Sequence, residues 1–546
     1  MSSAGGPQPH SLALLSLKPI NPRAEQVVAH PSNAHLVSRL EDGTLALDVG
    51  HVRSISGHNT LATLGRNGDI FVDGSSISRI HCSFEIDAET HIVMFYDRSN
   101  TQTTRVFGKD ATPFEHGRLR RVVVEEGLNT MIGMGGVGRN LVQFKLRWHA
   151  KQPEEMLKKV KEREGSHLKE NPRLARTVDE ADTTAPSRME TRIHTAGSRQ
   201  PKLRWKQMGE SLGAGQFGIV VKGLDLDSGK IMAVKLMSRS PGGGYEWSNL
   251  KREVEILAKI SHVGELLPHL TINDKADIVQ KHVVDYIFSQ GWEEGKAEIF
   301  MGLKDGTLHS LVTGGPPSTI SAFAEPVFHH MLQALDFLAT EGIIHRDLKP
   351  ENILYLLRQG HYHFQLSDFG LSNRQAIAVS CTGTAYYMAP EIYHSPAKQT
   401  PKVDVWSLFV TMLWTLDVAG FRGLLDTLDS YPAVQAAITS AAESKNVLQI
   451  RNMAEKDPRK RPSAAQLLVK HFNGKGLTTP RNRVQPSDFI IPVPPSDVTT
   501  PVVKAPPPVT KPSLPPWLES CGPSPKRLVR MGANPFGVRK LRPHLR

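Results

Sequence analysis

One short segment brings together residue types that suit phosphoryl transfer. Residues 345–352 read HRDLKPEN, and a DFG triplet follows at Asp368. A carboxylate such as that of Asp347 can accept the proton of an attacking hydroxyl, and Lys349, two residues later, can contact the transferring phosphate. Asn352 and Asp368 supply oxygen atoms, which magnesium prefers as ligands. We therefore expect Asp347 and Lys349 to be catalytic and Asn352 and Asp368 to bind metal.

A glycine-rich segment upstream predicts a hairpin that covers phosphate groups. Residues 213–220 read GAGQFGIV, and glycine lets a backbone approach phosphate oxygens closely. Lys235 follows in the strand-like IMAVKLM, where it can hold the α- and β-phosphates. The helical KREVEILAKI offers two acidic partners for this lysine, Glu253 and Glu255, which point roughly 200° apart around a helix. We choose Glu253 on the basis of the family resemblance described next, because the apolar stripe of the helix then falls where that family places it.

The ordered set of motifs resembles the signature of serine/threonine protein kinases, since APE at 389–391 follows DFG. The resemblance implies an α+β bilobal kinase fold over residues 204–473, with ATP and Mg²⁺ as cofactors and serine- or threonine-bearing proteins as substrates. It implies nucleotide contacts from residues of the first strands and the connector: Leu212, Gly213, Ala214, Gly215, Gln216, Phe217, Gly218, Val220, Ala233, Lys235 and Met301.

Several kinase residues beyond the catalytic set have expected roles. The resemblance implies a buried ion pair between Glu391 and Arg461, and it implies that Asp404 braces the backbone of the catalytic loop. Thr307 stands where many basophilic kinases have a glutamate. Selection of arginine before the target residue then rests on Glu351 and Asp305.

The segment between DFG and APE has 18 residues. Arg346, next to the expected base, needs an anion nearby, which phosphorylation commonly supplies. Ser380, three residues before Gly383, is the position that most resembles the phosphorylated site of related kinases, and Thr382 is the second choice. An ordinary solvated serine is an equally good reading of Ser380.

The preceding region predicts an all-β sandwich. Between residues 36 and 150, short apolar strands recur every 8–15 residues with turn residues between them. Arg66 ends one strand, the segment SRIH begins at Ser78, and a polar loop starts at residue 97. This order resembles the forkhead-associated (FHA) domain, which binds phosphothreonine peptides.

The FHA resemblance implies that Arg66 and Ser78 contact phosphate, that Arg79 adds positive charge, and that His81 supports the loops. The family usually has an Asn–Gly pair after its loop serine. Here Asn100 takes that role one position early, or Thr101 substitutes for it. The alternative reading is a purely structural β domain whose Arg66 and Ser78 are turn residues.

The remaining segments lack a periodic apolar pattern. We expect disorder in residues 1–35, a charged linker at 151–203 in which KQPEEMLKKVKEREG forms a transient helix, and a disordered, proline-rich basic tail at 474–546. The tail has 12 Lys and Arg against three acids, which supplies nine of the net +12 charges. Its basic patches read as nuclear import signals or as merely solvated chain. Three widely spaced cysteines indicate a reducing compartment.

The fold class is therefore multidomain, an all-β FHA sandwich followed by a bilobal kinase. This combination resembles the checkpoint-kinase-2 family, including fungal checkpoint and meiotic kinases. The expected partners are protein substrates, a phosphothreonine-containing protein and a transient second copy of this chain. We expect neither nucleic acid nor membrane as a partner, and a location in the nucleus, the cytoplasm or both. A catalytically weak phosphoprotein-binding scaffold is the alternative function.

Overall fold

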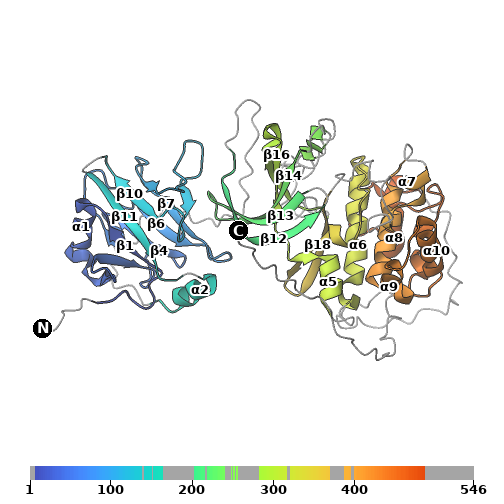
Figure 1. Ribbon diagram of the computed structural model, residues 1–546, viewed down its shortest axis with the longest axis horizontal. Coiled ribbons are helices and arrows are strands. Elements are labelled where there is room, and N and C mark those ends of the chain that lie inside the picture. The colour runs from blue at the N-terminus through green and yellow to red at the C-terminus, as the bar shows by residue number, and fades with distance from the viewer. Residues whose placement is uncertain are drawn as a thin grey trace, which may run out of the picture. The chain divides into compact units, whose positions relative to one another are not determined.

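Figure 1 shows the computed structural model of the chain. It describes residues 7–137, 140–150, 152–163, 202–215, 218–239, 247–248, 250–251, 254–255, 282–315, 320–368, 386–394 and 399–485. The chain divides into two compact units, the first of residues Met1–Gly242 and Tyr286–Leu303 and the second of residues Gly243–Asp285 and Lys304–Arg546.

The first unit begins with two antiparallel-rich sheets that pack as a sandwich (Figure 1). One sheet has the order β2 (Val37–Arg39), β3 (Leu45–Val49), β1 (Leu15–Pro19), β11 (Leu141–Trp148), β10 (Met131–Gly135) and β8 (Arg105–Phe107). The other has the order β5 (Ile70–Phe71), β4 (Thr60–Gly65), β6 (Cys82–Ile86), β7 (Val93–Asp97) and β9 (Arg121–Val123). Alternate residues of β11 are buried, as expected for a strand with one face on a core. The predicted all-β fold is confirmed.

The prediction that residues 1–35 are disordered is wrong from Leu15 onward. Strand β1 lies in the middle of its sheet and pairs with both β3 and β11, and Leu15 and Leu17 are fully buried. Helix α1 (Pro22–Val28) and the 3₁₀ helix η1 (Pro31–Leu36) follow. Asn21 caps α1 by accepting a 2.9 Å bond from the Ala24 amide, and a proline occupies the first turn of each helix, where it breaks no hydrogen bond.

The start of the expected linker also packs on the sandwich. Helix α2 (Pro153–Lys161) occupies the segment in which we predicted a transient helix. Arg163, which is 5% exposed, donates a 2.9 Å hydrogen bond to the Thr60 carbonyl oxygen. The rest of the expected linker, residues 164–201, lies outside the described residues.

A five-stranded antiparallel sheet completes the first unit. Its order is β12 (Trp205–Gly215), β13 (Gly218–Asp225), β14 (Ile231–Ser238), β16 (Lys296–Gly302) and β15 (Tyr286–Gln290). Its core cluster contains Val221, Met232, Val234 and Phe300. The 3₁₀ helix η5 (Trp292–Glu294) joins β15 to β16.

Within this unit, the turn between β13 and β14 contacts strand β9 of the sandwich. The Val123 amide donates a 2.9 Å hydrogen bond to the Leu226 carbonyl, and the two side chains share one buried cluster. The Asp227 carboxylate accepts from Arg118 at 3.0 Å and from Arg204. Both guanidinium groups are mostly buried, so this contact combines apolar packing with ion pairs.

The second unit is mostly helical. It contains a small sheet of β17 (Gly306–Thr307), β18 (Ile353–Arg358) and β19 (His361–Leu366). Its helices are α5 (Leu308–Gly314), α6 (Ile320–Thr340), η7 (Pro350–Asn352), α7 (Pro390–His394), α8 (Lys402–Thr415), η10 (Val418–Gly420), α9 (Phe421–Leu425), α10 (Tyr431–Ala442), η11 (Leu448–Ala454), α11 (Ala464–Phe472) and η12 (Arg481–Arg483). The strand-rich and helical units confirm the predicted kinase fold class (Figure 1).

Helix α8 is the most completely buried of the helices described above. All its residues from Val403 to Thr415 are buried. Among the described helices, none is by itself long and apolar enough to cross a membrane, although α8 and the segment Val418–Leu425, bent by 100°, pass that test as a pair.

The prediction that the chain is disordered from residue 474 is wrong for residues 474–485. This segment continues from α11, includes η12 and hydrogen-bonds to α6 and α11. Residues 486–546 lie outside the described residues. The prediction was based on the average composition of residues 474–546, and that average did not indicate that the first 12 residues are ordered.

Candidate active and phosphopeptide sites

The catalytic loop joins three of the predicted residues directly. Lys349 Nζ donates hydrogen bonds of 3.0 and 2.9 Å to the two carboxylate oxygens of Asp347. Asn352 Nδ2 donates to the Asp347 backbone oxygen at 2.7 Å and to its Oδ2 at 2.9 Å. The 3₁₀ turn of η7 makes this possible, because it folds Asn352 back toward the base. A carboxylate, an ammonium and an amide thus meet within one loop.

A buried aspartate from α8 holds that loop in place, as we predicted. Asp404 is 1% exposed and accepts 2.8 Å bonds from the backbone amides of His345 and Arg346. Burial raises the pKa of the Asp404 carboxyl, although nearby His345 opposes this shift. The His345 ring also bonds the Ser367 carbonyl at 2.7 Å, which fixes the residue before Asp368.

Two residues of this region have left-handed backbone conformations. Arg346 has φ +67° and Asp368 has φ +59°, which non-glycine residues adopt rarely. Such strain is concentrated at functional sites because surrounding contacts must maintain it. Arg346 Nε donates to the neutral Gln399 Oε1 at 2.7 Å, and among the described residues no ion pair joins Arg346 to a carboxylate.

Four predicted nucleotide contacts share one face of the five-stranded sheet. Val220 lies directly opposite Lys235 in the β13–β14 pair, and Ala233 lies opposite Met301 in the β14–β16 pair. Directly opposed residues of antiparallel strands point to the same face, as do residues two apart along one strand. All four therefore line one surface, where Lys235 is 4% exposed.

The glycine-rich hairpin leaves room for a ligand at one glycine and not at another. A Cβ added to Gly213 would meet no atom within 4 Å, so its backbone is open to an approaching group. A Cβ on Gly218, which has φ +139°, would lie 2.1 Å from the Leu236 carbonyl oxygen. Gly213 and Ala214 pair with Val220 and Ile219, and Leu212 beside them is 53% exposed. Gly215 pairs with Gly218 at the end of the hairpin.

Some predicted site residues lie outside the described residues. These are Gln216, Phe217 and Glu253, together with the candidate phosphosites Ser380 and Thr382. Of the flanking residues, Val254 is buried and Glu255 is exposed. Exposure of Glu255 argues against it as the partner of a buried lysine.

The predicted ion pair between Glu391 and Arg461 is confirmed. Its two bonds measure 2.6 and 3.0 Å, and Arg461 is fully buried over the Trp406 ring. The structure also explains Thr307, whose Oγ1 caps α5 by accepting a 3.0 Å bond from the Ser310 amide. A glutamate there would remove this hydroxyl cap.

The loops of the sandwich that hold the predicted phosphopeptide residues are bound to one another. The Arg66 amide donates to the Ser78 carbonyl at 3.1 Å, and the Asn67 amide donates to the Arg79 carbonyl at 2.8 Å. This approach requires Gly65, because an added Cβ would lie 2.3 Å from the Arg79 carbonyl oxygen. Arg66 and Arg79 are exposed, and Ser78 is partly exposed. Two guanidinium groups and a hydroxyl are therefore presented by adjoining loops.

His81 connects three loops from inside the sandwich. It is fully buried, its Nδ1 accepts a 3.1 Å bond from the Ser78 amide, and its Nε2 lies 3.2 Å from Thr103 Oγ1. Burial lowers the pKa of the imidazole, against the opposing effect of Asp97, and so favours the uncharged ring. His81 supports the loops and does not face solvent.

A buried carboxylate that we did not predict organises the polar loop after β7. Asp97 accepts hydrogen bonds from the Ser99 amide at 2.9 Å, from the hydroxyls of Ser99 and Thr104 at 2.6 and 2.7 Å, and from Arg120. Burial alone would raise the pKa of Asp97, but the bonds from Ser99, Arg120 and Thr104 lower it overall. Asn100 follows Ser99 and is exposed at the tip.

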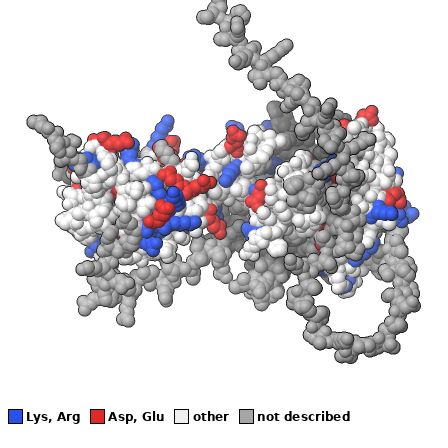
Figure 2. Space-filling model, turned by 90° about the horizontal axis from the view of Figure 1, so that it is seen from below, with Lys and Arg blue, Asp and Glu red and all other residues white. Residues whose placement is uncertain are grey.

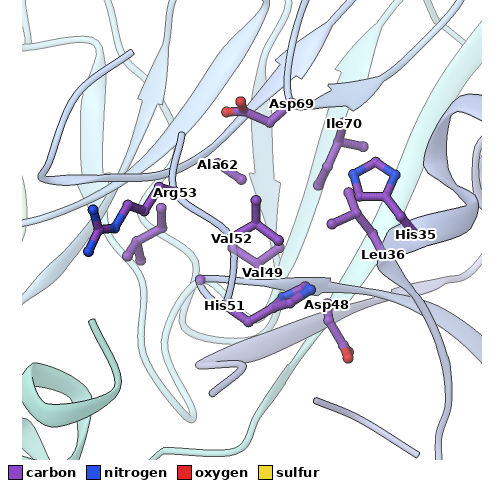
Figure 3. A pocket seen from close by; sticks show the side chains of 12 residues that line it. His35, Leu36, Asp48, Val49, His51, Val52, Arg53, Ala62, Asp69 and Ile70 are labelled. Atoms are coloured by element: carbon purple, nitrogen blue, oxygen red, sulfur yellow. The ribbon is translucent and has the colours of Figure 1, made fainter. Parts of the chain in front are cut away.

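A small pocket of the sandwich does not belong to these loops. Its lining includes His35, Asp48, His51, Arg53 and Asp69, and none of the predicted phosphopeptide residues (Figure 3). Its internal volume is about 20 Å³, which holds roughly one water molecule. We therefore assign no organic ligand to it.

The described surface carries charges of both signs close together. Figure 2 shows basic and acidic side chains interspersed over the face that it displays. Ion pairs account for part of this mixture, for example Arg118 with Glu115 and Lys206 with Glu125. A mixture of this kind is typical of a solvated surface.

A hairpin with an open glycine backbone and a loop braced by a buried aspartate are each elements that suit phosphoryl transfer. Residues 206–473 match the family model "protein kinase domain". Residues 206–473, about half of the chain, therefore form a protein kinase domain.

Curated relatives cover about half of the chain. CDPK-related kinase 8 of Arabidopsis thaliana is 29% identical over 281 residues, which are 48% of this chain and 43% of the relative. Serine/threonine-protein kinase 10 of Homo sapiens is 30% identical over 300 residues, 51% of this chain and 28% of the relative. The chain thus spans less than half the length of these relatives. A crystal structure of Rad53 1-466 in complex with AMP-PNP matches with a TM-score of 0.42 and 17% identity, covering 85% of this chain and 100% of that chain.

Proposed function

We propose that this chain is an ATP-dependent serine/threonine protein kinase that its FHA-like domain directs to phosphothreonine-containing proteins, in checkpoint, cell-cycle or meiotic signalling. The observation that carries the catalytic part is the cluster of Asp347, Lys349 and Asn352 in a loop braced by Asp404. A scaffold that had lost catalysis would not need all of these groups.

The donor set fits ATP and Mg²⁺. Asn352 and Asp368 offer amide and carboxylate oxygens, which suit magnesium, and Gly213 leaves its backbone open to phosphate oxygens. When bound, Mg²⁺ would neutralise charge on the phosphates. Asp347 orients the substrate hydroxyl and accepts its proton, while Lys349 places a positive charge beside that carboxylate. Lys235, buried on the sheet face described above, holds the nucleotide phosphates.

The decisive test is phosphorylation of a degenerate peptide library by the full chain with ATP·Mg²⁺. Asp347→Ala should reduce turnover by about 10²–10⁴-fold while nucleotide affinity changes little, because the base contacts the hydroxyl and not ATP. Asp368→Asn should weaken Mg²⁺-dependent nucleotide binding and turnover together. An inactive wild-type protein, even after phosphorylation of its activation segment, would support the scaffold alternative.

The targeting part rests on the exposed Arg66 and Arg79 beside Ser78 at one end of the sandwich. Arg66→Ala in the full chain should weaken phosphothreonine-peptide binding about tenfold or more, because a charge-assisted bond contributes on the order of 1.5–3 kcal/mol. Arg147→Ala, which removes an exposed arginine from strand β11, is the matched control. Equal affinity for phosphorylated and unphosphorylated peptides would exclude this role.

Activation in trans completes the proposal. Arg346 bonds a neutral glutamine, which leaves its charge available to a phosphate on Ser380 or Thr382. Docking of the FHA-like domain on a phosphorylated partner or second copy would raise the local concentration of kinase domains. Specific activity should then increase with protein concentration in the wild type and stay constant in Arg66→Ala. Full activity with an unmodified segment 371–388 would rule this out.

The basic patches of the tail support nuclear import, which a reporter fused to residues 520–546 would test.

A further inference from the structure

The segment beyond the kinase-domain match binds a buried carboxylate of α6. Asp336 lies on α6 and is 1% exposed. Its Oδ2 accepts bonds from the Thr478 and Thr479 amides at 2.6 and 3.0 Å, and its Oδ1 accepts a 2.5 Å bond from the Thr479 hydroxyl. The family match ends at residue 473, so these donors come from a segment outside the matched domain.

The two threonines are held in this position from both sides. On the preceding side, α11 ends at Asn473 with φ +50°, and the Gly474 amide bonds back to the Leu468 carbonyl at 2.9 Å. On the following side, Arg481 donates to the Asn473 side chain at 3.1 Å. Farther along, Gln466 of α11 donates to the Gln485 carbonyl at 2.9 Å. Residues 474–485 therefore fold as one turn-rich strap against α6 and α11.

The contact between the strap and α6 depends on the Thr479 hydroxyl as a hydrogen-bond donor. A buried carboxylate is costly unless donors satisfy it, and the three bonds described above come from two adjacent residues. The hydroxyl of Thr479 is the side-chain donor among them. Any change that turns this donor into an acceptor leaves two acceptors facing each other beside α6.

Thr479 is followed by Pro480, which is exposed and has φ −52° and ψ 130°. A threonine before an exposed, extended proline has the chemistry that proline-directed kinases recognise. Thr478 lacks a following proline. We propose that Thr479 is a phosphorylation site for a proline-directed serine/threonine kinase, and that phosphate at Thr479 releases residues 474–485 from α6.

The reaction uses ATP as phosphoryl donor. Thr479 Oγ1 attacks the γ-phosphorus, an O–P bond forms, the bond from that phosphorus to the oxygen of ADP breaks, and the modifying kinase accepts the hydroxyl proton. The product has no hydroxyl donor and carries about −1.5 to −2 charges beside the Asp336 carboxylate. Repulsion between these anions and the lost hydrogen bond both favour the released strap.

Coupling between the two events is reciprocal. If phosphate opposes docking, then docking opposes phosphorylation by the same factor in free energy. In the docked strap the Thr479 hydroxyl is engaged by Asp336, so the modifying kinase must act on the released form. Removing the charge of Asp336 should therefore speed modification of Thr479.

A second threonine in the same tripeptide provides an internal reference for the rate of phosphorylation at Thr479. The tripeptide Thr-Thr-Pro at 478–480 occurs again at 499–501. Full-length protein in an Asp347→Ala background, treated with a purified cyclin-dependent kinase and ATP·Mg²⁺, would be followed by mass spectrometry at Thr479 and Thr500. We expect Asp336→Asn to raise the rate at Thr479 relative to Thr500 about fivefold or more. Asparagine keeps a carbonyl acceptor of the same shape, which favours correct folding.

Hydrogen exchange supplies a second measurement that needs no change at Asp336. After kinase treatment, amides of residues 474–485 should exchange about tenfold faster. Thr479→Val, treated in the same way, should show no change on treatment, whereas Thr478→Val should still respond. Absence of phosphate on Thr479 in both the Asp336 and the Asp336→Asn proteins would overturn the site, and unchanged exchange in phosphorylated protein would overturn the release.

Discussion

The sandwich and the kinase domain each position a loop that carries proposed site residues with one buried aspartate, but they do so differently. Asp97 accepts from a backbone amide, two hydroxyls and a guanidinium. Asp404 accepts 2.8 Å bonds from two backbone amides of the catalytic loop. The pKa of Asp97 is lowered, because its donors outweigh the effect of burial, whereas burial raises the pKa of Asp404.

This difference teaches that burial of a carboxylate does not by itself define its role. Asp97 is fixed as an anion, and its charge contributes to the stability of the loop. The charge of Asp404 is disfavoured by its surroundings, so its value to the protein lies in the geometry that it imposes on His345 and Arg346. Substitutions at the two positions should therefore separate stability from function.

Of the changes that test this comparison, Asp404→Ala should have the largest effect. Without its two bonds, the backbone that carries Asp347 would shift, and misplacement of about 1 Å can cost roughly 10²-fold in rate. We expect turnover of a peptide substrate to fall by about that factor in a steady-state assay, while phosphopeptide binding stays unchanged. A matching loss of phosphopeptide affinity would indicate that the two regions are not independently braced.

The corresponding change in the sandwich, Asp97→Ala, should have the reverse selectivity. It removes the partner of Ser99, Thr104 and Arg120 and so loosens the loop that carries Asn100. We expect phosphothreonine-peptide affinity, measured by titration calorimetry, to fall about tenfold, since loss of a buried charged acceptor costs on the order of 1.5–3 kcal/mol. Kinase turnover on a short peptide should remain at the wild-type value, and a parallel loss of turnover would contradict the comparison.

The two halves also differ in how much the sequence could predict. The contacts of Asp347, Lys349 and Asn352 lie within one motif, and strand alternation places Val220 and Lys235 on one face. Strand β1 was missed because it pairs with β11, more than 120 residues away, and its flanking prolines resemble those of disordered chain. Local patterns predict local contacts, and long-range pairing needs the fold.

The same limit applies to the polar groups. Arg120 meets Asp97 across 23 positions, and Thr479 meets Asp336 across 143. The sequence around Arg120 and around Thr479 has no motif or unusual composition that points to a distant partner. Nothing near either residue therefore indicated its contact with a distant aspartate. The roles assigned to residues outside the described part of the chain, such as Glu253, remain predictions.

Two glycines, one in each region, extend the comparison to positions where another group comes close to the backbone. Gly65→Ala would place a Cβ 2.3 Å from the Arg79 carbonyl oxygen, and a backbone atom yields less easily than a side chain. Overpacking of this kind typically costs about 1–3 kcal/mol. We expect a lower urea midpoint for the sandwich and weaker phosphopeptide binding, measured on the full chain by hydrogen exchange and titration.

Gly213→Ala is the matched change in the kinase domain. The added Cβ meets nothing within 4 Å in the protein, so the urea midpoint should stay close to the wild-type value. If nucleotide phosphates approach this backbone, the affinity for ATP should fall severalfold. An unchanged affinity would show that the nucleotide does not contact Gly213.

The smallest effect, and the sharpest contrast, is in the dependence of stability on pH. The pKa of Asp97 is lowered below its ordinary value of 3.8, so its contribution is complete above pH 3.8 and is lost as the pH falls through the lowered value. The pKa of Asp404 is raised above 3.8. Between pH 3.8 and the raised pKa the folded state therefore binds more protons than the unfolded state, and the contribution of this group to stability decreases as the pH rises. At pH 7, Asp97→Asn should therefore destabilise the sandwich, whereas Asp404→Asn should leave the stability of the second unit unchanged or increase it even as turnover falls. Urea unfolding followed by hydrogen exchange at pH 7 and pH 4 would measure both, and equal destabilisation by the two asparagines would refute the opposite signs.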